Sequence, residues 1–187
     1  MMIRCRRAEF WAMQGESLAY NKREMKEILQ AKSGNKKAMK TVVERVLPML
    51  QRYVFLRIPN ESVPVVLTDI TFDMAKKVVK FDPERDISEA AWAIKIARNR
   101  VLTFLKNNKV EHDYPLYGSR LEIMADALDT EIVEEIKVKL MKMPPHEREV
   151  LELKFMLKLS IKEAAYVIQK SEGDVRVMQL RALRKMR

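Results

Sequence analysis

Apolar residues recur along almost the whole chain at spacings of three and four, and this periodicity constrains the fold more than any other feature. Such spacing places apolar side chains on one face of an α-helix, whereas a half-buried strand alternates every second residue. One stripe runs over 38–54 with Pro48 inside it, where a proline is expected to kink a helix. Further stripes run over 67–81 and 93–105. We therefore predict an all-α fold.

Two small helical domains are predicted, because a change in composition separates the helical stripes. The stretch 111–135 carries eight acidic residues and one basic residue, which is typical of a linker between domains. We assign a basic N-terminal arm to 1–23, a first domain to 24–110, the acidic linker to 111–131 and a second domain to 132–187.

Three capping-box spacings predict where helices begin. Asp86 with Glu89 precedes the stripe 93–105, and we expect a helix over 88–108. Two further pairs, Ser160 with Glu163 and Ser171 with Asp174, lie eleven residues apart near the C-terminus. A helix of about eight residues, a turn over 169–171 and a second helix to the C-terminus make a helix-turn-helix. The second helix of such a motif normally enters the DNA major groove.

The net charge and the rarity of special residues limit the function. A formal charge of +10 favours a polyanionic partner, either nucleic acid or an acidic membrane surface. We expect no membrane insertion, because no run of 18 apolar residues is present. The single Cys5 fits a reducing compartment and therefore the cytoplasm, and His112 and His146 lack the spacing of metal ligands. We therefore expect no metal, no cofactor and no enzymatic activity.

Segments in both halves resemble one protein family. MPPHEREVLELKF, LSIKEAAYVI and SEGDVRVMQLRALRKMR are similar to the C-terminal domain of bacterial sigma factors. AKSGNKKAM, KFDPE and AWAIKIARNRVLTFLKNNK resemble the family's other domain in the right order. The spacing between them leaves no room for a third domain, which is typical of the small extracytoplasmic-function group. The resemblance covers about 24–110 and 132–187 and implies a sigma region 2 bundle followed by a sigma region 4 helix-turn-helix.

The resemblance implies two DNA contacts. The C-terminal helix would read the minus-thirty-five element through Lys170, Ser171, Arg176, Val177, Leu180, Arg181 and Arg184. The helix over 88–108 and the lysines before it would contact the minus-ten element through Lys76, Lys77, Lys80, Lys95, Arg98, Asn99, Thr103 and Lys106. In the family, the loop before this helix captures a flipped base, so 81–90 is expected to form that pocket. Trp92 is expected to be a core anchor rather than a base-stacking residue.

The resemblance also implies protein partners. Members bind the beta and beta-prime subunits of core RNA polymerase through the helix after Pro64, where the family pattern resembles DLVQETF. This chain reads VLTDITF there, which leaves Asp69, Phe72 and Asp73 as the candidate polymerase contacts. Promoter DNA and an anti-sigma protein are the other partners implied, and outside the polymerase complex we expect a monomer.

Two other functions stay open on the sequence alone. A stand-alone helix-turn-helix regulator would bind DNA without polymerase, normally as a dimer on a palindrome. A degenerate sigma paralogue would sequester polymerase without melting DNA, which the divergent VLTDITF segment and Gln179 would fit.

Overall fold

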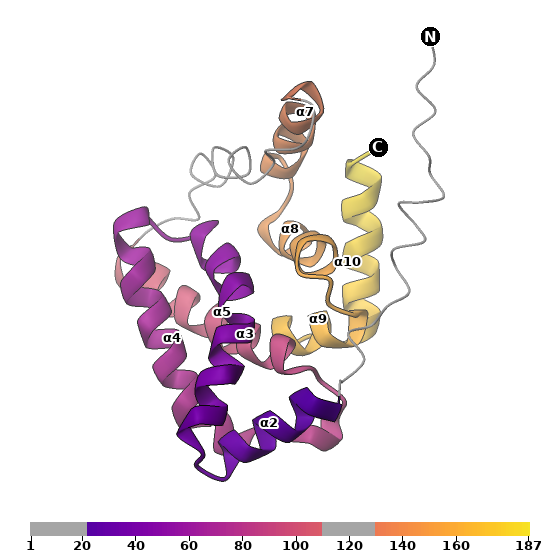
Figure 1. Ribbon diagram of the computed structural model, residues 1–187. Helices are drawn as coiled ribbons and strands as arrows, with labels where there is room; N and C mark the ends of the chain where they lie inside the picture. The colour runs from indigo at the N-terminus through magenta and orange to yellow at the C-terminus, as the bar shows by residue number, and fades with distance from the viewer. Residues whose placement is uncertain (1–21, 110–129) are drawn as a thin grey trace.

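The described part of the protein, residues 22–109 and 130–187 of a computed structural model, is built from helices, as predicted (Figure 1). Residues 111–129 of the predicted linker and nearly all of the basic arm lie outside these residues, and α7 begins at Thr130, inside the predicted linker. The first half holds α2, α3, α4 and α5, and the second half holds α7, α8, α9 and α10. Their bounds are Lys22–Lys32, Lys36–Phe55, Val63–Lys77, Glu89–Asn107, Thr130–Met141, Pro145–Leu151, Ile161–Ile168 and Glu172–Lys185. Short 3-10 turns cover Asn60–Ser62, Val78–Lys80 and Pro83–Arg85, and a π-helical turn covers Glu152–Met156.

The predicted apolar stripes form the core of the first half. On α3 the buried side chains include Val42, Val46 and Leu50, spaced as the sequence pattern requires. The helix continues through Pro48, so this proline does not end it. Ile70 and Met74 of α4 are fully buried against the same core.

Trp92 of α5 is a core residue, as expected. Its side chain is buried, and its ring packs edge-on against Phe81 with 5.6 Å between the ring centroids.

The start of α5 differs from the predicted capping box. Ser88, not Asp86, is the N-cap, because the Ser88 hydroxyl accepts a hydrogen bond from the Ala91 amide at 3.2 Å. Asp86 instead has a left-handed backbone with φ of 52°, which ends the preceding 3-10 turn. Both residues suit a cap chemically, and the left-handed turn at Asp86 decides between them because it places the helix start two residues later.

The two C-terminal caps are confirmed. The Ser160 hydroxyl accepts from the Glu163 amide at 3.2 Å, and the Glu163 carboxylate accepts from the Ser160 amide at 2.8 Å, which completes the capping box. The Ser171 hydroxyl accepts from the Asp174 amide at 3.1 Å and starts α10. Between them Gln169 has φ of 63°, the left-handed conformation that reverses the chain after α9. This geometry builds the predicted helix-turn-helix.

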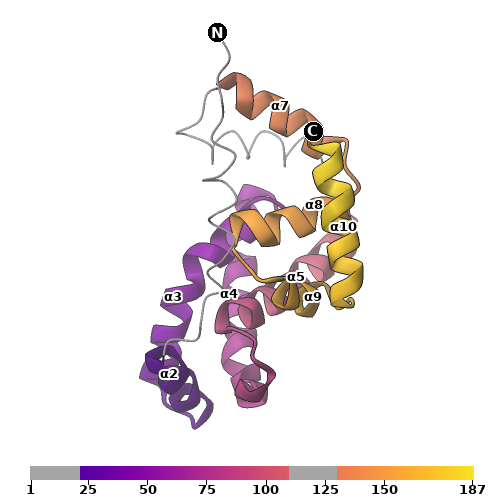
Figure 2. The ribbon, with the colours of Figure 1, turned by 90° about the vertical axis from the view of Figure 1, so that its right-hand side faces the viewer.

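The two halves pack directly on one another, with α5 of the first half against α9 of the second (Figures 1 and 2). Ile94 and Ile96 of α5 belong to the same buried apolar cluster as Ala164 and Val167 of α9. A second cluster joins Leu56, at the end of α3, to Leu140 and Met143 beside α7. Two apolar clusters therefore cross the boundary between the halves.

A cluster of three carboxylates around Arg45 lies at the start of α5, and Glu89 is its buried member. Nε of Arg45 is 2.8 Å from Oε1 of Glu89, but neither atom has a hydrogen-bond partner among the described residues. Arg45 is also paired with Glu24 and Glu27 of α2. Burial raises the pKa of Glu89 from 4.5 to about 7, against the attraction of Arg45 and with the repulsion of Glu24 and Glu27. One guanidinium thus serves three carboxylates.

We predict that Glu89→Gln stabilises the protein at pH 8 by on the order of 2 kcal/mol and leaves its stability nearly unchanged near pH 5. The pKa of Glu89 is higher in the folded protein than in the unfolded chain. The wild type therefore loses stability as the pH rises from about 4.5 to about 7, and an uncharged amide removes that loss. Urea unfolding at both pH values measures the difference, with Glu44→Gln on the exposed face of α3 as the control. An equal effect of Glu89→Gln at both pH values would contradict this prediction.

Candidate nucleic-acid interface

The face of α10 that is turned to solvent carries the residues predicted to read the minus-thirty-five element. Val175 and Ala182 are fully buried on the opposite face, where α10 packs against α8 and α9. The seven predicted side chains are exposed in the structure: Lys170, Ser171, Arg176, Val177, Leu180, Arg181 and Arg184. The structure therefore brings this whole set together on one accessible surface.

Arg176 lies near the start of this surface, where recognition helices contact base edges. Its guanidinium is 3.5 Å from the Glu172 carboxylate, and both side chains are well exposed. Such a solvent-exposed pair contributes little and breaks readily when a stronger partner arrives. The arginine fork therefore remains available for the two acceptors of a guanine or for a phosphate.

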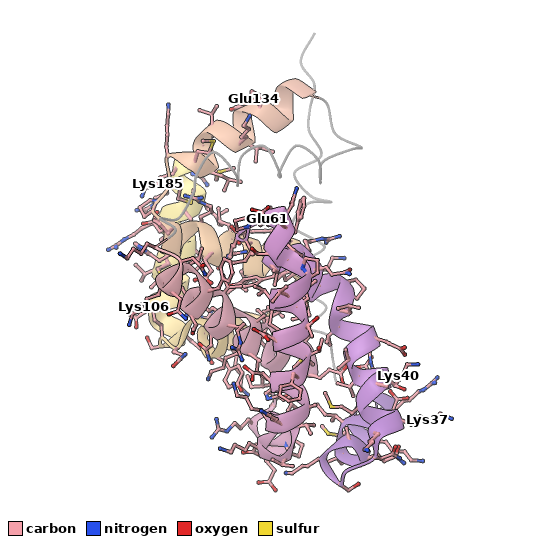
Figure 3. All side chains as sticks on the ribbon, turned by 90° about the vertical axis from the view of Figure 1, so that its left-hand side faces the viewer. Lys37, Lys40, Glu61, Lys106, Glu134 and Lys185 are labelled. Atoms are coloured by element: carbon pink, nitrogen blue, oxygen red, sulfur yellow. The ribbon has the colours of Figure 1, made fainter. Side chains whose placement is uncertain are left out.

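The residues predicted for the minus-ten element divide into two groups on α5. Asn99, Thr103 and Lys106 are exposed on one outward face, and Lys106 is marked in Figure 3. Lys95 and Arg98 instead face the second half. The ammonium group of Lys95 lies 3.9 Å from the centre of the Tyr166 ring on α9. The structure therefore does not bring the five α5 residues onto one accessible surface.

Arg98 makes a bidentate ion pair with Glu149 of α8. Its Nε and Nη2 atoms donate to the two carboxylate oxygens at 2.9 and 3.2 Å. The Tyr53 hydroxyl donates to the same carboxylate at 2.9 Å. Burial alone would raise the pKa of Glu149, but Arg57, Arg98 and Tyr53 together hold it below its usual value. Glu149 is therefore charged at neutral pH.

The loop over 81–90, expected to form the base pocket, also contacts the second half. The Ser88 amide donates to the Glu163 carboxylate at 3.3 Å, and the Ser88 hydroxyl donates to the same oxygen. Lys162 of α9 donates to Asp86 at 2.9 Å. Ser88 is only 8% exposed, so this part of the loop is covered.

The three lysines at the end of α4 are exposed, but two of them already have neighbours in the first half. Lys76 lies 4.1 Å from the centre of the Phe72 ring, and Lys77 pairs with Asp73 at 3.3 Å. Lys80 is exposed on the following 3-10 turn. Lys76 therefore belongs as much to the surface around Phe72 as to a nucleic-acid surface.

The predicted polymerase contacts lie on a mixed apolar and acidic face of α4. Val65 is 64% exposed and Phe72 is 60% exposed, and Asp69 lies between them along the helix. Asp73 is half-buried, and its carboxylate accepts a hydrogen bond from Arg100 at 2.7 Å. Burial would raise the pKa of Asp73, but Arg100 and Lys77 hold it below its usual value. Large apolar side chains this exposed commonly mark a site of protein contact.

The sequence predictions missed Arg100 and Glu149. Arg100 lies in the ARNR segment, one turn from Ile96, and its spacing gives no sign that it supports Asp69 and Asp73 from α5. Glu149 is one of many acidic residues, and nothing in its local pattern marks it as the partner of Arg98. Only the folded chain shows its role, because Arg98 and Tyr53 converge on its carboxylate.

The described residues hold neither a candidate metal site nor a candidate membrane span. Residues 22–109 and 130–187 contain no cluster of three or more metal-ligating side chains. In the same ranges, every helix is too short or too polar to cross a membrane.

Comparison with known proteins shows similarity to sigma factors. Residues 134–186 match the family model described as sigma-70, region 4. The chain is also 26% identical over 177 residues to the ECF RNA polymerase sigma factor BldN of Streptomyces coelicolor. That alignment covers 87% of this chain and 64% of BldN, so the chain spans less than two thirds of that relative.

Solved structures extend the comparison. CnrH in complex with the cytosolic domain of CnrY is 26% identical with a TM-score of 0.61, over 86% of this chain and 92% of that chain. The sigma factor RpoE, in complex with the anti-sigma factor NepR from Bartonella quintana, is 18% identical with a TM-score of 0.58. That match covers 80% of this chain and 94% of the other and supports the fold alone. Taken together, these matches show a sigma-70 region 4 domain at residues 134–186 and a similarity along most of the chain to an extracytoplasmic-function sigma factor.

Proposed function

We propose that the protein binds core RNA polymerase and directs it to promoters, where it recognises two DNA elements and assists melting. The observation that carries this proposal is the face of α10. Its seven candidate side chains are all exposed, while Val175 and Ala182 anchor the helix from behind. A capped recognition helix with an exposed basic face is the arrangement that major-groove reading requires.

At the minus-thirty-five element, α10 enters the major groove with its N-terminal turn toward the bases. Arg176 and Arg181 are the residues that we assign to base contact. A guanidinium can donate two hydrogen bonds to O6 and N7 of a guanine, which gives sequence preference rather than attraction alone. Arg184 and Lys170 lie at the ends of the surface and contact phosphates.

At the minus-ten element, the exposed face of α5 contacts the separated non-template strand. Asn99 and Thr103 supply hydrogen-bonding groups, and Lys106 supplies charge for the backbone. Lys95 and Arg98 join them once the second half moves away. Lys80, Lys76 and Lys77 follow the strand electrostatically. Unstacking one base costs a few kcal/mol, which binding of the strand can offset without a chemical fuel.

Polymerase contacts the outward face of α4, with Phe72 as its apolar centre and Asp69 as its charged partner. Asp73 supports this face through Arg100, which ties α4 to α5. The divergent VLTDITF segment therefore still presents an exposed aromatic residue beside a carboxylate.

Further partners follow from the same proposal. The structural relative RpoE is bound to an anti-sigma factor, and we propose that an anti-sigma protein also holds this chain inactive. The proposed site of action is the cytoplasm, where polymerase is found. Outside the complex with polymerase and DNA the protein is a monomer.

Run-off transcription with purified bacterial core polymerase and a genomic fragment pool tests the proposal. We expect discrete transcript starts that share a pair of upstream elements. Tight binding to core polymerase without starts would indicate a sequestering paralogue. DNA binding without any binding to polymerase would indicate a stand-alone regulator.

We predict that Arg176→Ala lowers transcription from a promoter found in this way by about ten- to a hundredfold, the loss expected for one bidentate base contact. Binding to core polymerase should not change, because Arg176 lies on α10 and the proposed polymerase contacts lie on α4. Arg52→Ala, which removes an exposed arginine on α3, is the matched control and should leave transcription unchanged. Equal losses in both variants would show that α10 does not read the promoter.

We predict that Phe72→Ala weakens binding to core polymerase by about tenfold or more, because exposed aromatic side chains dominate protein interfaces. The fold should be unaffected, since most of this side chain is already in solvent. Leu29→Ala on α2, another exposed apolar residue, is the control. Titration of labelled protein with core polymerase measures both affinities, and unchanged binding of Phe72→Ala would remove α4 from the interface.

A further inference from the structure

The contacts between the two halves use the same side chains that the minus-ten element would need. The guanidinium of Arg98 donates two hydrogen bonds to Glu149, and the ammonium group of Lys95 lies over Tyr166. Glu149 takes the Nε and Nη2 edge of this guanidinium, and the side chain is only 18% exposed, so a phosphate cannot use that edge while α8 is in place. DNA and α8 therefore compete for Arg98.

Most hydrogen bonds and ion pairs between the halves run in one direction, and the pair of Lys162 with Asp86 is the exception. Three carboxylates of the second half, Glu149, Glu152 and Glu163, accept from donors of the first half. The Glu152 carboxylate pairs with Arg57, and both side chains are nearly buried. The second half thus offers negative charge to a positively charged surface, as a nucleic-acid backbone does.

The same contacts cover the loop beside α5. Glu163 binds the amide and hydroxyl of Ser88, and Lys162 holds Asp86 two residues earlier. By contrast, the seven candidate side chains of α10 stay exposed. The closed arrangement therefore masks one DNA surface and leaves the other accessible.

We propose that the second half is an internal competitor for the minus-ten surface, with Glu149 occupying the place of a DNA phosphate on Arg98. This inference rests on the proposed function, because it concerns the regulation of the same surface. The chain must separate α8 and α9 from α5 before it binds the strand. The apparent affinity for single-stranded DNA is then the affinity of the open form multiplied by the fraction that is open.

Glu149→Gln tests the proposal, because it removes the charge and keeps the shape of the side chain. The full chain is titrated against a fluorescein-labelled, mixed-sequence single-stranded DNA of about 20 nucleotides, long enough to span the site sizes of such surfaces. We expect binding to tighten by about tenfold relative to the wild type, because a larger fraction is open. Glu147→Gln is the matched control: it lies on the same helix, has a side chain that is 5% exposed against 14% for Glu149, and pairs with Lys185 inside the second half.

A distance measurement reports opening without DNA. Fluorescent labels are placed on Lys40→Cys of α3 and Lys142→Cys after α7, with Cys5→Ser in the background. Energy transfer between them should fall in Glu149→Gln and stay at the wild-type value in Glu147→Gln. Should Glu149→Gln fail to fold, as judged by circular dichroism, Tyr166→Leu is used, which removes the contact with Lys95; a gain of about twofold is expected from the same population shift.

The outcomes separate this inference from the proposed function. If Glu149→Gln opens the chain without tighter binding to DNA, the second half does not mask the minus-ten surface. If energy transfer is unchanged, the pair of Glu149 with Arg98 does not hold the two halves together. An equal gain in Glu147→Gln would show a general effect of charge and would also overturn the proposal. Run-off transcription by the wild type is measured in parallel. A sigma factor whose halves do not compete with DNA gives transcripts but no gain in Glu149→Gln, whereas a protein that opens but lacks sigma activity gives the gain without transcripts.

Discussion

The Glu163 carboxylate holds the closed structure together at the point where the two halves meet. It completes the capping box of α9 through the Ser160 amide, and its other oxygen accepts from Ser88, the N-cap of α5. It is nearly buried, so its charge needs these donors and the positive ends of two helices to offset desolvation. One side chain thus fixes the relative position of α5 and α9, and the shared apolar core packs around that junction.

This arrangement creates a conflict between stability and access. Arg98, Lys95 and Ser88 are best satisfied when the second half covers them, yet the proposed function requires them, or the loop beside them, to face DNA. The polar character of the contacts makes the conflict reversible, because DNA phosphates can replace carboxylates as partners for Arg98 at little cost. The apolar contacts between the halves, such as those of the cluster that joins Ile94 and Ile96 to Val167, have no such substitute and are exposed to water on opening.

Local sequence patterns predicted the elements well where the decisive interaction spans only a few residues. Ser160 with Glu163 marked a capping box whose two hydrogen bonds are both present, and Ser171 marked the start of α10. The same reasoning placed the cap of α5 at Asp86, and the left-handed turn there moved it to Ser88. Two adjacent candidates for a cap cannot be ranked by residue type alone, because the backbone path before the helix decides which side chain reaches the amides.

The sequence by itself determined that the chain is helical, where α9 and α10 begin, and which face of α10 is exposed, because periodicity and capping act within one or two turns. Only the tertiary structure decided which side chains of α5 are exposed. Arg98 and Asn99 are neighbours on the same helix, yet Arg98 is held by Glu149, 51 residues away, while Asn99 faces solvent. Pairing over such a distance depends on how the halves pack, and no local pattern encodes it. For the same reason Glu163 was identified as a cap of its own helix and not as the link between the two halves.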